Sequence, residues 1–143
     1  MRPPMETVEK VIGRFANSFD LKDWESLESV LAENVSVDYS HLRGQREALS
    51  RTDYVSQRRT ALQHLNTHHL LTNAEIEISA NSASCRVSGM IYRAKDDEHF
   101  NSHVVYNFQL ERAGTSWLIV GIEQTVLWNE GNPEIHSGAN TAD

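Results

Sequence analysis

Cysteine is almost absent from this chain: Cys85 is the single one in 143 residues. No disulfide can therefore form within the chain, and no pair of cysteines can hold zinc or carry out redox chemistry. No apolar run approaches the ~20 residues of a membrane-spanning helix, and the first residues lack the apolar core of a signal peptide. We expect a soluble, cytoplasmic protein that binds no membrane.

Basic residues are also few, with 13 Lys and Arg against 20 Asp and Glu, for a net charge of −7. This balance argues against a general nucleic-acid surface. The seven glycines form no GxGxxG, GxxxxGK[ST] or GxSxG motif, so the sequence predicts no nucleotide-dependent chemistry and no cofactor. The length is most simply that of one domain over residues 1–143, long enough to bury a core without disulfides or metals.

Three segments show helical patterning. In the first, apolar residues recur at spacings of four, three and four, which places them on one helical face: Val8, Ile12, Phe15 and Phe19. Asp23 can cap a second helix, which we expect to end at Asn34. A third helix is predicted from about Thr52 to Leu65, after a polar loop over residues 41–51.

Alternation with period two predicts the strands. We expect them over residues 35–40, 67–72, 74–78, 83–93, 99–112 and 116–128. From Asn129 onward the chain is polar with Gly and Pro, which predicts a loop or flexible tail over residues 129–143.

The order of helix, helix, strand, helix and then a run of strands predicts an α+β fold. A strongly curved antiparallel sheet wrapped around the N-terminal helices would leave a cone-shaped cavity between the layers. The last strand contains the continuous apolar run WLIVGI, so both of its faces favour burial. We therefore expect a homo-oligomer, a dimer or trimer, formed through the sheet.

Three side chains are the first candidates for chemistry. Asp20 ends the first apolar helical segment, Tyr39 shares a strand face with Val35 and Val37, and His69 begins an apolar run at the start of a strand. A carboxylate beside a histidine raises the imidazole pKa and fixes its tautomer, which makes a proton shuttle near neutral pH. The alternatives are that Asp20 only terminates its helix and that Tyr39 is a core aromatic.

A histidine cluster, His64, His68 and His69, could suggest a metal site. Adjacent residues on a strand point to opposite faces, so His68 and His69 do not easily share one ion. We therefore predict no metal site, with His64 and His68 at the surface.

The strand over residues 99–112 has one face that is more polar, with His103 and Asn107 on it. Polar groups are costly to bury without partners, so this face either meets solvent or lines a polar-spotted pocket. The apolar strands on either side favour the pocket. Trp128 could close its mouth, or could be a core or interface aromatic.

Two stretches resemble a known family. SFDLKDW over residues 18–24 with VDY over residues 37–39, and LNTHHL over residues 65–70, resemble the SnoaL-like branch of the nuclear transport factor two-like (NTF2-like) superfamily, closest in motif to scytalone dehydratases. The resemblance implies a cone-shaped, cystatin-like α+β barrel. It also implies that Asp20 and His69 form an acid/base dyad, that Tyr39 positions a water or substrate carbonyl, and that Asn107 lies near a pocket asparagine.

Two departures from that pattern change the implied activity. Phe19, a candidate to line the substrate site, stands where scytalone dehydratases have a tyrosine, and their second catalytic histidine would fall near Ala94. The resemblance thus implies a cofactor-independent lyase or isomerase that acts on a small, largely apolar, oxygenated substrate, with the dyad kept. The alternatives are a non-catalytic binding or assembly module on the same fold, and a structural small subunit of a ring-hydroxylating dioxygenase.

Overall fold

The computed structural model describes residues 6–39 and 46–136. These residues form three α-helices, six strands and one 3₁₀ turn. In chain order they are α1 (Val8–Leu21), α2 (Trp24–Ser29), β1 (Leu31–Asp38), β2 (Arg46–Ser50), α4 (Arg51–Leu62), β3 (Asn66–Ser79), β4 (Ser82–Lys95), β5 (Glu98–Ala113), β6 (Ser116–Gly131) and η1 (Pro133–Ile135).

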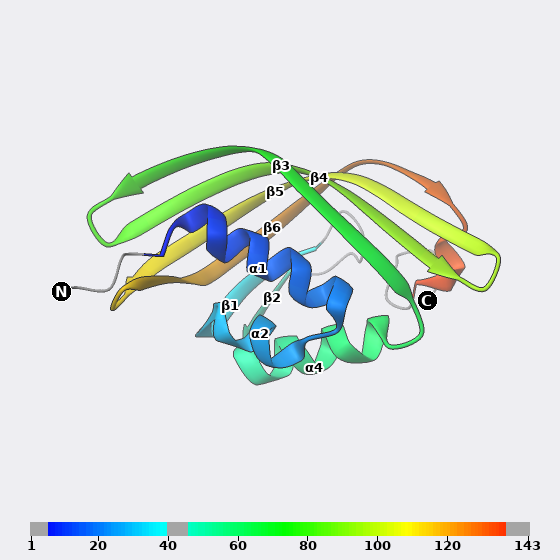
Figure 1. Ribbon diagram of the computed structural model, residues 1–143, viewed down its shortest axis with the longest axis horizontal. Helices are drawn as coiled ribbons and strands as arrows, with labels where there is room; N and C mark the ends of the chain where they lie inside the picture. Colours follow the sequence, from blue (N-terminus) through cyan, green and yellow to red (C-terminus); the bar gives the residue numbers. More distant parts are fainter. Residues whose placement is uncertain (1–5, 40–45, 137–143) are drawn as a thin grey trace.

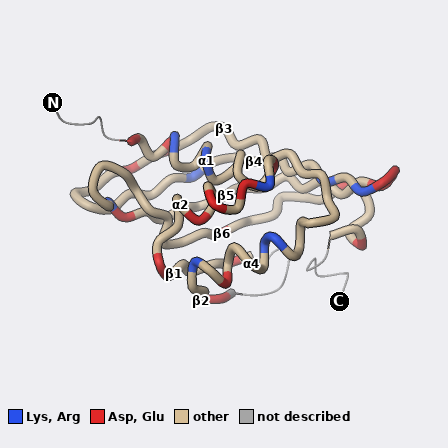
Figure 2. The backbone as a smooth tube through the Cα atoms, turned by 60° about the horizontal axis from the view of Figure 1, so that its bottom comes forward, with Lys and Arg blue, Asp and Glu red and all other residues tan. Residues whose placement is uncertain are grey.

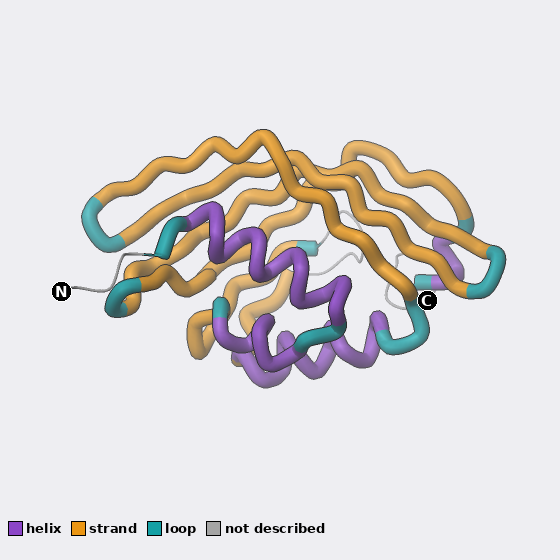
Figure 3. Tube along the Cα trace, viewed as in Figure 1, coloured by secondary structure: helices purple, strands orange, loops and turns teal. Residues whose placement is uncertain are grey.

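The six strands form one curved sheet in the order β2-β1-β6-β5-β4-β3. All neighbouring pairs are antiparallel except β1 and β6, which are parallel. The sheet arches over α1, while α2 and α4 lie below it beside β1 and β2 (Figures 1 and 3). The expected α+β fold with a curved sheet around the helices is confirmed, although in the part of the chain described the sheet stays open, with β2 and β3 at its edges.

The caps of the first two helices explain where they begin and end. The Thr7 hydroxyl accepts a hydrogen bond from the Lys10 N–H at 3.1 Å at the start of α1, and Lys22 ends the helix in the left-handed region. Asp23 caps α2, as predicted, by accepting from the Ser26 N–H at 3.1 Å. The prediction that α2 reaches Asn34 is wrong. The chain pairs with β6 from Val30 onward (the Ile119 N–H donates to the Val30 carbonyl at 2.8 Å), and this pairing overrides the weak helical preference.

Two strand assignments also differ from the sequence prediction. Part of the predicted loop over residues 41–51 is β2, which pairs with β1 and ends at Ser50, the cap of α4; residues 40–45 lie outside the described part. The two strands predicted over residues 67–78 are the single strand β3. A bulge at Asn73, whose φ is 57°, shifts the pairing register. The extra residue interrupts the alternation of the sequence, which therefore predicts two strands instead of one.

The C-terminal segment continues in regular structure as far as it is described, where the sequence predicts a loop or flexible tail from Asn129. β6 continues to Gly131, η1 follows, and His136 is buried. The Asn132 N–H donates to the His99 carbonyl at 2.7 Å, so the segment folds back onto β5. Gly131 has a φ of 97°, and a Cβ there would collide with the His99 carbonyl oxygen. Residues 137–143 lie outside the described part.

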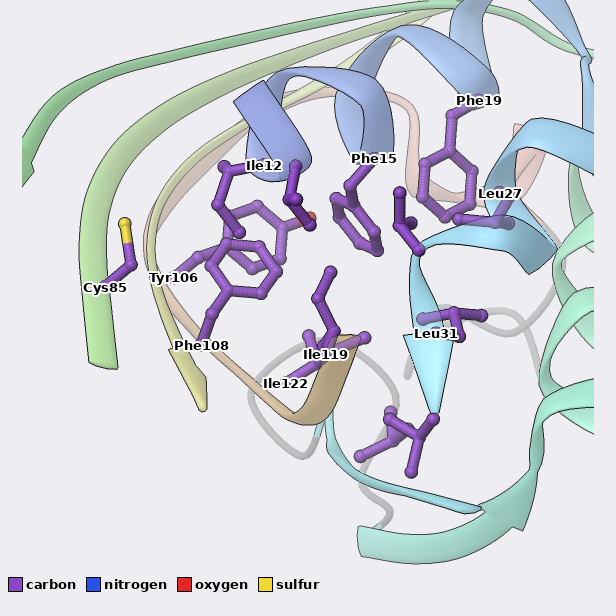
Figure 4. Packing of buried hydrophobic residues seen from close by; sticks show 14 of the residues in the cluster. Ile12, Phe15, Phe19, Leu27, Leu31, Cys85, Tyr106, Phe108, Ile119 and Ile122 are labelled. Atoms are coloured by element: carbon purple, nitrogen blue, oxygen red, sulfur yellow. The ribbon is translucent and has the colours of Figure 1, made fainter. Parts of the chain in front are cut away.

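The hydrophobic core lies between α1 and the inner face of the sheet (Figure 4). Phe15 is fully buried and meets Phe19 and Phe108 edge to face, with ring centroids 5.0 and 5.1 Å apart. Such pairs add about 0.5–1.5 kcal/mol beyond the area that they bury. The same packing fixes the last turn of α1, and with it Asp20, against β3. No helix among the described residues is long and apolar enough to cross a membrane.

Candidate functional site

Asp20 and His69 form a hydrogen-bonded pair between α1 and β3. The imidazole Nδ1 lies 2.7 Å from Asp20 Oδ1, and the backbone N–H of His69 donates to Asp20 Oδ2 at 2.8 Å. The Thr67 hydroxyl donates to Oδ1 at 3.1 Å. The carboxylate is therefore held at three points by one strand, and the pairing predicted from the sequence is present.

Burial sets the charge state of this histidine. Burial lowers the pKa of His69 below its ordinary value of 6.5, the hydrogen bond and charge of Asp20 oppose this, and the positive charge of Arg93 adds to the lowering. The sequence-based expectation of a raised pKa is wrong, because loss of solvation outweighs the carboxylate. At neutral pH the ring is then uncharged, with Nδ1–H donating to Asp20 and the Nε2 lone pair free to take a proton.

Phe19 fixes the plane of the imidazole. Its ring stacks on His69 with centroids 5.2 Å apart and an interplanar angle of 26°, and it is 3% exposed. The residue that precedes Asp20 therefore lines the cavity beside His69, with a ring face in place of a hydroxyl.

The imidazole borders a small polar cavity of about 20 Å³. That volume holds about one water molecule. The lining residues come from the last turn of α1, the end of β1, α4, the four long strands and the C-terminal segment: Phe19, Tyr39, Arg58, Leu62, His69, Ile91, Arg93, Tyr106, Gln124 and His136.

The phenol groups of Tyr39 and Tyr106 face this cavity. The Tyr39 and Tyr54 hydroxyls lie 2.6 Å apart, and Gln124 Nε2 donates to the Tyr106 hydroxyl at 3.0 Å. Burial raises the pKa of Tyr106, as does the nearby Tyr39. Tyr106 thus keeps its proton at neutral pH, and with its oxygen accepting from Gln124, its O–H is free to donate into the cavity.

Three predicted site residues lie elsewhere, which corrects the expectation of one shared pocket. His103, Asn107 and Trp128 lie on the outer face of the sheet, because the inward positions of β5 are Ser102, Val104, Tyr106 and Phe108. His103 stacks on Trp128, which is 53% exposed, at 4.0 Å. The Asn107 amide donates to Glu123 at 3.3 Å.

Sequence reasoning missed five polar residues of the cavity: Arg58, Arg93, Tyr106, Gln124 and His136. The alternation of inward and outward positions along the strands could have revealed two of them. Arg93 has the same strand parity as the buried Ile91, and Gln124 the same as the buried Ile122. A polar residue in register with core residues either pairs with other buried groups or faces a site.

The histidine cluster does not converge. His64 and His68 are exposed, while His69 faces inward. Within residues 6–39 and 46–136, no three His, Cys, Asp or Glu side chains lie close enough together to hold a metal ion.

Solved structures share this architecture over most of the chain. The Kfla4162 protein from Kribbella flavida is 19% identical, with a TM-score of 0.82 over 89% of this chain and 92% of that one. A candidate scytalone dehydratase from Novosphingobium aromaticivorans is 15% identical, with a TM-score of 0.77 over 87% and 85%. The hexachlorocyclohexane dehydrochlorinase LinA-type3 from Novosphingobium barchaimii is 14% identical, with a TM-score of 0.71 over 90% of each chain.

None of the curated proteins compared with this chain matches it. The model of the SnoaL-like domain family, however, matches residues 5–123, most of the chain and all elements from α1 into β6. This match shows that the chain belongs to the SnoaL-like domain family.

Proposed function

We propose that this protein is a cofactor-independent lyase or isomerase of the dehydratase type, with His69 as general base and acid and Asp20 as the group that orients it. One observation carries the proposal: a buried, uncharged imidazole is fixed through Nδ1 by a carboxylate at 2.7 Å and borders a polar cavity. A base whose pKa lies near or below the working pH is available in its deprotonated form.

In the elimination, His69 Nε2 takes the proton from the carbon next to a carbonyl. The electrons of that C–H bond form the C=C bond as the bond from the neighbouring carbon to hydroxyl breaks. The imidazolium then returns the proton to the departing hydroxide, and water leaves. Asp20 stabilises the transient imidazolium, so substrate gives alkene and water with no other reactant. In the isomerisation, the proton returns to a different carbon.

The phenols suit the developing negative charge. As the proton is removed, charge moves to the carbonyl oxygen, and the hydroxyl of Tyr106 or of Tyr39 can donate a hydrogen bond to it. One such donor in a site closed to water is worth about 2.7–4 kcal/mol of barrier. The predicted role of Tyr39 in holding a carbonyl or water is kept here and extended to Tyr106.

The names of two similar structures support this class of reaction. One is a candidate scytalone dehydratase and the other a dehydrochlorinase, and both words describe removal of hydrogen with a leaving group from neighbouring carbons. At 14–15% identity these structures supply no substrate for this chain.

The alternative is a module without turnover, in which the polar residues only satisfy one another inside the core. The cavity has space for about one water molecule, so a substrate or any other ligand enters only after lining side chains move. The Asp20–His69 geometry favours the enzyme. A purely structural polar core does not need an imidazole base at a cavity wall, next to phenols that can donate to an oxyanion.

The experiment is to incubate the protein with a panel of β-hydroxy and β-halo carbonyl compounds and to follow alkene formation by ¹H NMR. The matched variants are His69→Gln and His68→Gln, because His68 is the neighbouring residue with its side chain exposed on the outer face. We expect turnover by the wild type and the His68 variant, and a loss of about 10²–10⁴-fold in the His69 variant. Equal turnover by the two variants would refute the assignment.

We also propose that copies of the chain associate through the outer face of β3–β6. This face carries partly exposed apolar side chains on three strands, including Leu70, Tyr92 and Trp128, at 44%, 40% and 53% exposure. A sheet face of this kind is typical of a surface that packs on another chain.

A further inference from the structure

Two buried arginines at the cavity have no carboxylate partner within residues 6–39 and 46–136. Arg58 and Arg93 are 6% and 3% exposed, and both line the cavity beside His69. None of the ion pairs between described residues includes either guanidinium. The carboxylate of the dyad, Asp20, is bound by His69 and Thr67 instead. This is unusual in a chain whose charges of both signs are otherwise spread along its length (Figure 2).

The contacts of the two arginines differ. Arg93 donates to the Ser102 hydroxyl at 2.8 Å and to the Phe100 carbonyl at 3.5 Å, and it lies over the Phe100 ring at 5.0 Å. Arg58 lies over the Tyr39 ring at 5.5 Å, and its buried Nε has no hydrogen-bond partner among the described residues. A cation–π contact recovers only part of the free energy that an ion loses when it leaves water.

The two guanidiniums also repel each other. Burial, opposed by Tyr106 and reinforced by the charge of Arg58, lowers the pKa of Arg93 to about 10. Arg93 nevertheless stays protonated at neutral pH. His69 is uncharged, and in the part of the chain that the structure describes Asp20 is the one carboxylate that pairs with it. The two guanidiniums therefore give the cavity wall an excess of positive charge that an anionic ligand would neutralise.

We propose that the site selects an anionic substrate, a small organic carboxylate whose carboxylate group binds between Arg58 and Arg93 while its carbon skeleton faces His69. The guanidinium fork matches a carboxylate in a bidentate geometry, and Arg58 has the free donor to make that contact. This inference rests on the proposed function for the reacting end of the substrate. The anion site itself is a property of the arginines alone.

The binding test uses three carboxylates, each with its neutral amide: acetate with acetamide, benzoate with benzamide, and cyclohexanecarboxylate with its amide. Affinities are measured by calorimetry at neutral pH and constant ionic strength. We expect at least one acid to bind about tenfold or more tightly than its amide, a difference of about 1.4 kcal/mol. Arg58→Met should abolish this preference. Arg59→Met, at the exposed neighbouring position on α4, should retain it.

Thermal unfolding of the same variants separates binding from structure. Replacing an uncompensated buried charge by an apolar side chain of similar length is often neutral or stabilising, so Arg58→Met should unfold at or above the wild-type temperature. A preference for amides or no preference in the whole panel overturns the proposal. The proposal is also overturned if Arg58→Met still prefers acids, or if the unfolding temperature of Arg58→Met falls far below that of the wild type.

Failure of the proposed function has a different signature. His69→Gln should keep the acid preference while it loses turnover. If the wild type binds an acid but turns over no compound, the proton chemistry is wrong and the anion site stands. If turnover is found on neutral compounds and no acid is preferred, the anion site is wrong and the dyad stands.

Discussion

Replacing Asp20 by Asn should reverse the tautomer of His69. The carboxylate has two acceptor oxygens: Oδ2 for the His69 backbone N–H at 2.8 Å, and Oδ1 for the imidazole Nδ1–H at 2.7 Å and the Thr67 hydroxyl at 3.1 Å. An asparagine has one acceptor oxygen and one NH₂ group. The backbone N–H cannot become an acceptor, so the amide oxygen must face it, and the NH₂ must face the imidazole.

The imidazole then accepts at Nδ1 and carries its proton on Nε2. The base that faces the substrate is lost, although the ring keeps its place. The hydrogen bonds to His69 also become neutral ones, which changes a charged bond of about 1.5–3 kcal/mol into one of about 0.5–1.5 kcal/mol. Summed over both bonds, with the hydroxyl of Thr67 able to turn and accept, we expect a destabilisation of about 2–3 kcal/mol.

The assay is ¹⁵N NMR of the imidazole, which distinguishes a protonated from a bare ring nitrogen, together with urea unfolding. Asp23→Asn is the matched control, because Asn caps a helix as well as Asp does and Asp23 caps α2. The wild type and the control should show Nδ1–H, and Asp20→Asn should show Nε2–H. The same tautomer in wild type and Asp20→Asn would refute the reasoning.

Three further predictions follow from the structure. Because the pKa of His69 is lowered in the folded protein, this histidine takes up a proton in the unfolded chain first as the pH falls. The free energy of unfolding should therefore decrease below about pH 6.5, and urea unfolding at several pH values should show a smaller decrease in His69→Gln. Phe15→Ala should cost about 3–5 kcal/mol in urea unfolding and Leu21→Ala, at 76% exposure, under about 0.5; similar costs would contradict the core assignment. Trp128→Asp should shift sedimentation toward the monomer without loss of fold, and an unchanged mass would remove the outer face as the interface.

Short-range patterns were enough to predict the elements that carry the dyad. The spacing of Val8, Ile12, Phe15 and Phe19 fixed the buried face of α1, and so the place of Asp20 at its end. The switch to period two after Asn66 then placed His69 at the start of a strand. The family resemblance implies that Asp20 and His69 pair, and in the structure His69 Nδ1 lies 2.7 Å from Asp20 Oδ1.

The rest depended on contacts between distant parts of the chain. Alternation along β5 separates two faces but does not say which one is inside, so the apolar neighbouring strands favour the pocket for the polar face of His103 and Asn107 although it lies outside. The buried Arg58 and the C-terminal His136 reach the cavity through the packing of α4 and the return of the chain after Gly131. Neither is visible in local periodicity, because a lone Arg on a helix is typical of an exposed face.

Removal of a carbon-bound proton by His69 is the central claim, and hydrogen exchange tests it without a leaving group. Carbonyl compounds with no β-substituent cannot eliminate, so uptake of deuterium from D₂O next to the carbonyl, followed by ¹H NMR, reports proton removal alone. We predict exchange catalysed by the wild type and by His68→Gln, and slower by about 10²–10⁴-fold in His69→Gln. Exchange at the wild-type rate in His69→Gln would contradict the account.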